Sequence, residues 1–250
     1  MKNRIKKLLL SAAAVLFWIL VWSVLAFFAN QKLLLKIPMP LDTLKAFCVG
    51  ITTSRFWEAV TSSLLHIVSG FLFAVALGVL VGMLCGSNNL FKTFCSPLLH
   101  LIRSVPVAAF IFLAWLWVPN SILPSFISFL TVFPIVCSHI ESGLSAVDNR
   151  LTEMASVMGM SRMGIIKNIK LPTVLPFLRT AMITGLGFAW KSGVAAEVIC
   201  NPTGSIGALL SAAKLTIDYT EVFAVTLTIV LLSLLLENII KLVWREKKYE

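Results

Sequence analysis

Few residues in this sequence have the types and spacing that enzyme chemistry requires. The three histidines, His66, His100 and His139, are scattered, and none lies beside a serine or cysteine motif of the nucleophile type. No G-x-x-x-x-G-K-[ST] loop is present to hold nucleotide phosphates, and the five cysteines form no CxxC pair. We therefore expect no enzyme activity, no metal site and no cofactor in this chain.

Three charged residues are more informative, because each lies within or beside an apolar segment. Lys191 lies about eight residues from the nearer end of its segment, too far for its side chain to reach water comfortably. A central lysine costs ~2.5 to 3.5 kcal/mol on membrane-insertion scales, so such a residue faces a bundle interior or a watery cavity. We take Lys191, Glu197 and Arg103 as candidates for a solute pathway. The alternative for Lys191 is an ion pair with Glu141 or Glu237 on a neighbouring helix.

Membrane spans are the elements that must position these residues. The 250-residue chain is 58% hydrophobic and 13% charged, with a mean hydropathy of +0.94, whereas soluble domains carry about 25% charged residues. Its apolar residues form blocks of about twenty, long enough for helices that cross ~30 Å of hydrocarbon. We predict an all-α integral membrane protein with one domain, 1–250, and about six transmembrane helices, at 8–29, 64–85, 98–118, 123–141, 177–199 and 222–243.

The basic residues predict the orientation of these spans. With the amino terminus inside, most of the 21 lysines and arginines fall in segments on the cytoplasmic side. Under the positive-inside rule, both termini and the segment 142–176 are therefore cytoplasmic, while 32–58 and 201–221 lie outside. The net charge of +10 then reports topology, and we expect no nucleic-acid partner. The first block also resembles a signal peptide at its start, but it is longer than the usual apolar region, and we interpret it as a retained span.

Two spans carry a small residue at every fourth position. The series are Gly70, Ala74, Gly78, Gly82 and Gly86 in one span, and Ala181, Gly185, Ala189 and Gly193 in another. Small residues at this spacing let helix backbones approach closely. We expect tight helix packing along both series, with a sliding, gating interface as the alternative.

The segment 142–176 is predicted to be a helix-turn-helix. Asp148 is placed to cap a short helix, and Gly159 is placed to end it. Ser161 can cap a second helix, which we expect to stop at Leu171-Pro172. Apolar residues at i, i+3, i+4 and i+7 give the first helix a stripe that a partner or the membrane surface must cover: Leu151, Met154, Ala155 and Met158.

The same segment carries a family signature. It reads Glu153-Met154-Ala155, three residues, Gly159, nine residues, then Ile169-Lys170-Leu171-Pro172. This resembles the EAA signature of binding-protein-dependent ABC importer permeases, Glu-Ala-Ala, three residues, Gly, nine residues, Ile-x-Leu-Pro. The one departure is Met154 for the central alanine. The resemblance extends over about 56–243, with 142–176 as the coupling loop.

The resemblance implies a function and a set of partners. In that family the loop docks into a cytoplasmic ATPase, so Glu153, Met154, Ala155, Gly159, Ile169, Leu171 and Pro172 are the expected ATPase-coupling residues. The family also implies two copies of an ABC ATPase subunit that bind ATP-Mg, a second permease copy or homologue, an external solute-binding protein and a bacterial inner-membrane location, with membrane lipids around the spans.

Softer motifs point to a branch of that family. They are Arg103-Ser104-Val105-Pro106, Ala196-Glu197 and Gly204-Ser205-Ile206-Gly207, and they are similar to those of nitrate, sulfonate and taurine permeases. A departure lies at Trp115-Leu116-Trp117, where that branch more often has Trp-Phe-Gly. The alternatives are an importer permease for another solute class, and a membrane enzyme or passive channel.

Overall fold

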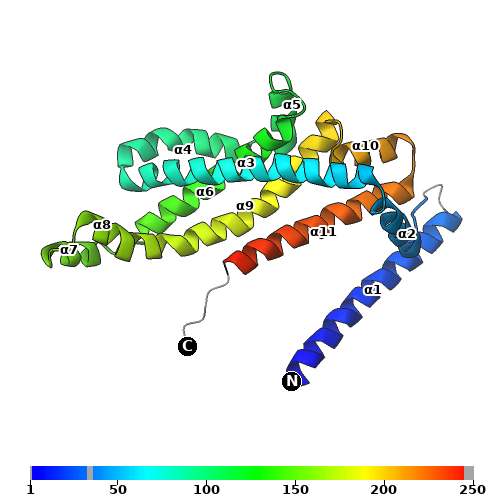
Figure 1. Cartoon of the computed structure of the whole chain (residues 1–250), viewed down its shortest axis with the longest axis horizontal. Helices are drawn as coiled ribbons and strands as arrows, with labels where there is room; N and C mark the ends of the chain where they lie inside the picture. Colours follow the sequence, from blue (N-terminus) through cyan, green and yellow to red (C-terminus); the bar gives the residue numbers. More distant parts are fainter. Residues whose placement is uncertain (1, 33–35, 245–250) are drawn as a thin grey trace.

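The computed structural model describes residues 2–32 and 36–244, which form helices joined by short connections (Figure 1). Five helices are long and apolar enough to cross a membrane. They are α1 (Lys2–Lys32), α3 (Ser54–Ser87), α6 (Leu123–Ser145), α9 (Leu171–Cys200) and α11 (Tyr219–Val243). The shorter elements are α2 (Pro40–Gly50), α4 (Asn89–Ser104), α5 (Val107–Trp115), α7 (Asn149–Val157), α8 (Arg162–Ile165), a π-helical turn η1 (Ile166–Lys170) and α10 (Ile206–Leu215).

Helix α6 forms the centre of the bundle, packed between α3 and α9. The small residues of both series lie on the buried faces of α3 and α9, except for the exposed Gly86. The closest approach is at Gly70, where an added Cβ would lie 2.1 Å from the carbonyl oxygen of Ser125 in α6. The tight packing that the spacing predicts is therefore present, because only a residue without a side chain fits there.

The prediction of a single span over the apolar block 98–118 is wrong in one respect, because the block is not one straight helix. It is divided between α4 and α5, which meet at an angle of 100°. Val105 has an extended backbone at the break, with ψ 131°, because the ring of Pro106 disfavours a helical residue before it. The described residues thus contain five candidate spans, and six if the bent pair counts as one.

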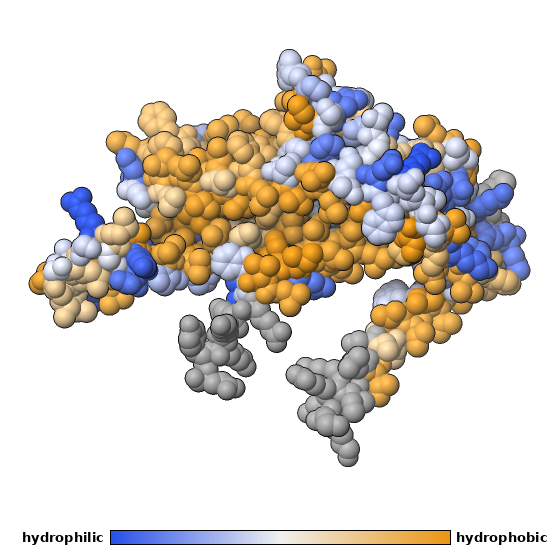
Figure 2. Space-filling model, viewed as in Figure 1, coloured by the Kyte–Doolittle hydropathy of each residue, from blue (hydrophilic) through white to orange (hydrophobic). Residues whose placement is uncertain are grey.

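The segments between spans gather at opposite ends of the bundle (Figure 1). Helices α2 and α10 lie at one end, and α7 and α8 lie at the other, in agreement with the predicted alternation of 32–58 and 201–221 against 142–176. Figure 2 shows an apolar surface along the middle of the bundle, with hydrophilic residues gathered toward the ends. Helix α1 extends away from the other spans and contacts α2. Its Trp22 ring also stacks on the ring of Phe223 in α11, with 5.7 Å between the ring centroids.

Candidate coupling surface and solute pathway

Helix α7 begins as the sequence predicts. Asp148 has an extended backbone, and its Oδ1 accepts a hydrogen bond from the backbone N–H of Arg150 at 2.8 Å. This bond satisfies one of the N–H groups that the first turn of a helix leaves without a partner. The cap fixes where α7 starts, directly after α6 has left the bundle at Ser145.

Helix α7 ends in a turn that needs Gly159. The N–H of Met160 donates to the Ala155 carbonyl at 2.9 Å, and the N–H of Gly159 donates to the Ser156 carbonyl at 3.1 Å. This pair of bonds is a Schellman motif, whose central residue takes a left-handed conformation. Gly159 has φ +81°, as the motif requires. Ser161 then caps α8, its Oγ accepting from the N–H of Gly164 at 3.1 Å.

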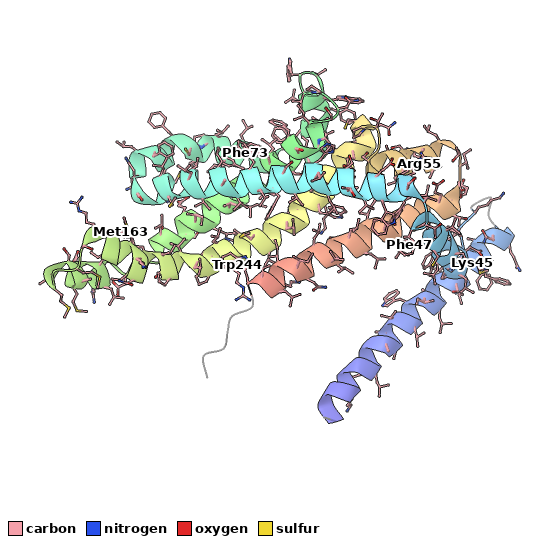
Figure 3. All side chains as sticks on the ribbon, in the orientation of Figure 1. Lys45, Phe47, Arg55, Phe73, Met163 and Trp244 are labelled. Carbon is pink, nitrogen blue, oxygen red and sulfur yellow. The ribbon has the colours of Figure 1, made fainter. Side chains whose placement is uncertain are left out.

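The two short helices present an exposed apolar surface. Val157 is 89% exposed and Met158 is 80% exposed, and Leu151, Met154 and Met163 are also exposed. Figure 3 shows Met163 at this far end of the molecule. Five exposed apolar residues on two short helices and the turn between them, outside the membrane-spanning bundle, indicate a docking surface. We call the exposed side chains Leu151, Met154, Val157, Met158 and Met163 the coupling surface.

Ala155 is an exception to the predicted stripe. It is only 7% exposed, so it lies on the inner side of α7, and its carbonyl group holds the Gly159 turn. Of the other expected coupling residues, Glu153, Met154 and Gly159 are exposed. Ala155 can therefore support the coupling surface from beneath, whereas Glu153 and Met154 can touch a partner directly.

The expected stop at Leu171-Pro172 is wrong. The chain stays helical from Arg162 to Cys200, passing through η1 into α9. In the π turn the hydrogen bonds reach five residues back, and the N–H of Leu171 donates to the Ile166 carbonyl. Pro172, which has no N–H and whose ring would clash in a regular helix interior, follows directly on this widened turn. Leu171 and Pro172 are exposed and Ile169 is half-buried.

Glu197 lies fully buried at the far end of α9. Its Oε2 accepts hydrogen bonds from the Ser63 hydroxyl at 2.7 Å and from the N–H of Gly207 at 3.1 Å. The Ser63 oxygen accepts in turn from the N–H of Ile206 at 2.9 Å. Because Ile206 and Gly207 open α10, the carboxylate holds the N-terminus of that helix on α3 and α9.

This placement gives Glu197 a structural role. The carboxylate has no exposed surface, and its other oxygen, Oε1, is buried without a hydrogen-bond partner among the described residues. The role of Glu197 in a solute pathway stays a prediction. Ser63, the partner that links Glu197 to α10, was not among the residues predicted from the sequence. Serine is unremarkable at a span end, so only the packing of α3 against α10 reveals it.

Arg103 joins α4 to α6. Its guanidinium donates hydrogen bonds to the Pro134 carbonyl and to the Ser138 hydroxyl of α6, while the side chain stays partly exposed. It borders a cleft of about 140 Å³ that Lys92 and Glu141 also line. Those two form an ion pair of 2.8 Å between α4 and α6.

Lys191 lies exposed on α9 and forms no ion pair with any residue that the structure describes. The two suggested partners are both engaged elsewhere, since Glu141 pairs with Lys92 and Glu237 pairs with Lys241. The alternative of a salt bridge to either residue is therefore wrong. Thr180, Thr184 and Phe188 share the exposed face of α9 with Lys191, so this face offers polar groups and one cation at membrane depth.

The chain is similar in sequence to two transport permeases and in fold to a chain of a solved transporter. The taurine transport system permease protein of Escherichia coli is 28% identical over 192 residues, which cover 75% of this chain and 68% of that protein. The bicarbonate transport system permease protein of Synechococcus elongatus is 28% identical over 160 residues, covering 63% and 57%. A chain of the bacterial alginate ABC transporter, solved in complex with a pentasaccharide-bound periplasmic protein, shares the fold with a TM-score of 0.64 at 14% identity, covering 97% of this chain and 95% of that one.

A family model gives the assignment. Residues 74–248 match the model described as "binding-protein-dependent transport system inner membrane component". That range contains the candidate spans α6, α9 and α11 and the whole coupling surface. The chain therefore belongs to the inner membrane components of binding-protein-dependent transport systems, the permeases of ATP-binding-cassette importers.

Proposed function

We propose that this permease carries a small anion across the bacterial inner membrane and is driven by a separate ATPase that docks on the coupling surface. The observation that carries the proposal is the exposed apolar row on a capped helix, ended by Gly159, within the EAA-like signature. Two copies of the ATPase subunit, which bind ATP-Mg themselves, supply the energy. This chain supplies the path and has no catalytic activity of its own.

The proposed assembly includes a second permease copy or homologue and an external solute-binding protein. Helix α1 and the exposed face of α9 leave apolar side chains uncovered within one chain, which is consistent with further contacts in lipid or in an assembly. ATP-driven closure of the ATPase pair would move α7 and α8, and the continuous helix from Arg162 to Cys200 would carry that movement into the bundle.

The anionic solute class rests on Lys191 and on the relatives. An unpaired cation at membrane depth lowers the cost of bringing an anion there, and a cationic solute would be repelled. Relatives carry taurine and bicarbonate in their names, as stated above. Arg103 is a second candidate, since its guanidinium stays partly exposed beside α6. An importer permease for another solute class is the alternative.

A reconstituted system tests the proposed solute. The permease is placed in liposomes with the ATPase and the binding protein encoded beside it, and uptake of taurine, an alkyl sulfonate and bicarbonate is measured. We expect ATP-dependent uptake of one of these anions, and a loss of at least tenfold in Lys191→Met. Lys214→Met, which removes an exposed lysine at the end of α10, is the matched control. Unchanged uptake in Lys191→Met would remove the pathway role.

The orientation is tested separately in intact cells. We propose that both termini and the coupling surface are cytoplasmic, so a cysteine at Ser161 should resist a membrane-impermeant reagent while one at Leu215 reacts. Both positions are exposed in the chain, and the native cysteines are first replaced. Labelling of the cysteine at position 161 from outside the cell would contradict the proposed orientation.

A further inference from the structure

A cavity of about 470 Å³ lies at the end of the bundle opposite the coupling surface. Helices α2, α10 and α11 and the start of α3 enclose it, and Figure 3 shows Phe47 and Arg55 at this end. Most of its wall is apolar. The side chains that argue for a ligand are the charged ones, Arg55 from α3, Asp218 before α11 and Glu221 in the first turn of α11.

These three charged side chains border the same cavity, and none of them is engaged in an ion pair with a residue in the described part of the chain. One oxygen of Asp218 caps α11 by accepting a hydrogen bond from the N–H of Glu221 at 3.0 Å. The carboxylate of Glu221 caps none of the described helices. The cavity thus presents one cation and two carboxylates at its border.

A second cavity adjoins the first along α11. It measures about 130 Å³, shares Phe47, Phe56 and Thr228 with the larger one, and is lined further on by Leu231, Leu232 and Leu235. Residues at spacings of three and four lie on one face of a helix, so this wall follows the face of α11 toward the middle of the span. The two neighbouring cavities together present charged side chains at one end and leucines at the other, and we refer to the pair as the groove.

We propose that this groove binds a zwitterionic phospholipid with a primary ammonium headgroup. Its phosphate would meet Arg55, its ammonium would meet Glu221 and Asp218, and one acyl chain would lie along the Leu231 to Leu235 face of α11. A lipid with only an anionic headgroup would bring a phosphate to two carboxylates without a compensating cation of its own. An apolar protein helix in the groove would leave all three charges without a partner.

Native mass spectrometry of the whole permease tests the proposal. The protein is exchanged into nanodiscs of equal parts phosphatidylethanolamine, phosphatidylcholine and phosphatidylglycerol and then released. We expect about one phosphatidylethanolamine retained per chain in preference to the other two. Arg55→Gln and Glu221→Gln should each lower that retention about tenfold, as the loss of a hydrogen bond to a charged group implies. Asp218 is spared because it caps α11.

Matched controls and a second readout keep the test sharp. Lys214→Gln and Glu58→Gln remove charges at the same end but outside the groove, and they should retain the lipid. Val225→Phe fills the cavity without a change of charge and should release it. Equal retention of all three lipids, or equal loss in the control variants, would overturn the proposal. A photo-crosslinking residue at Leu235 should yield a lipid adduct, and a crosslinked permease dimer there would show instead that a protein helix fills the groove.

Discussion

Gly159 offers a substitution whose cost the structure isolates. Its φ of +81° lies in the left-handed region, and a Cβ added there would meet nothing within 4 Å. A side chain at this position therefore costs backbone strain alone, with no clash. Any effect must come through the turn between α7 and α8 and so through the geometry of the coupling surface.

The expected magnitudes follow the ease with which each residue adopts a positive φ. A non-glycine residue held in this region costs of order 1–3 kcal/mol, asparagine least and β-branched residues most. At ~1.4 kcal/mol per tenfold, the population of the native turn would fall by roughly fivefold to a hundredfold. We expect uptake to decrease in the order Gly159, Gly159→Asn, Gly159→Ala, Gly159→Val.

Uptake and ATPase binding should be measured together for this series, at matched levels in the membrane. The account requires ATPase binding to fall in the same order as uptake, because the strain acts on the docking surface. If Gly159→Val transports as well as Gly159→Asn, the left-handed turn is not needed for coupling. If uptake falls while ATPase binding stays unchanged, the turn acts at a later step than docking.

Three further predictions concern other parts of the molecule. Glu197→Ala leaves the buried N–H of Gly207 without an acceptor and opens a cavity. We therefore expect thermal unfolding in detergent to show that the free energy of unfolding falls by ~2 to 5 kcal/mol. Glu197→Gln, which keeps an acceptor oxygen, should lower it by less than half as much. Gly70→Ala must push α6 away and should cost ~1 to 3 kcal/mol, whereas Gly187→Ala, with only a 3.6 Å contact to Glu237, should be neutral or slightly stabilising; equal losses would contradict the packing argument. Glu153→Lys should weaken ATPase binding more than Glu153→Gln if the exposed carboxylate meets a basic partner, and identical binding would remove that contact.

The span pattern was predictable because it rests on local properties. Apolar blocks of about twenty residues, the caps at Asp148 and Ser161 and the glycine at position 159 are each readable from a few neighbouring residues. The structure contains the two caps and the glycine turn, and each apolar block except 98–118 lies within one helix. The interruption at Pro106 was equally visible in the sequence. Its outcome was not, because the 100° bend depends on what α4 and α5 pack against.

The contacts that depend on distant pairs were out of reach. Lys92 and Glu141 lie 49 positions apart in a sequence that contains several other acidic and basic residues. The sequence therefore could not show that Glu141 pairs with Lys92 and not with Lys191. Ser63 and Glu197 meet because α3 and α9 share one end of the bundle. The π turn was missed for a different reason, since Leu171-Pro172 is a reliable stop in a regular helix and a widened turn removes the conflict.

The central claim is that a separate ATPase docks on the coupling surface. Met158 and Leu215 are both 80% exposed but lie at opposite ends of the bundle, directly after α7 and at the end of α10. A photo-crosslinking residue is placed at each position in turn, and the permease is co-expressed with the ATPase encoded beside it. The account predicts a crosslink to the ATPase from Met158 and none from Leu215. A crosslink from Leu215 alone, or from neither position while the complex remains assembled, would contradict it.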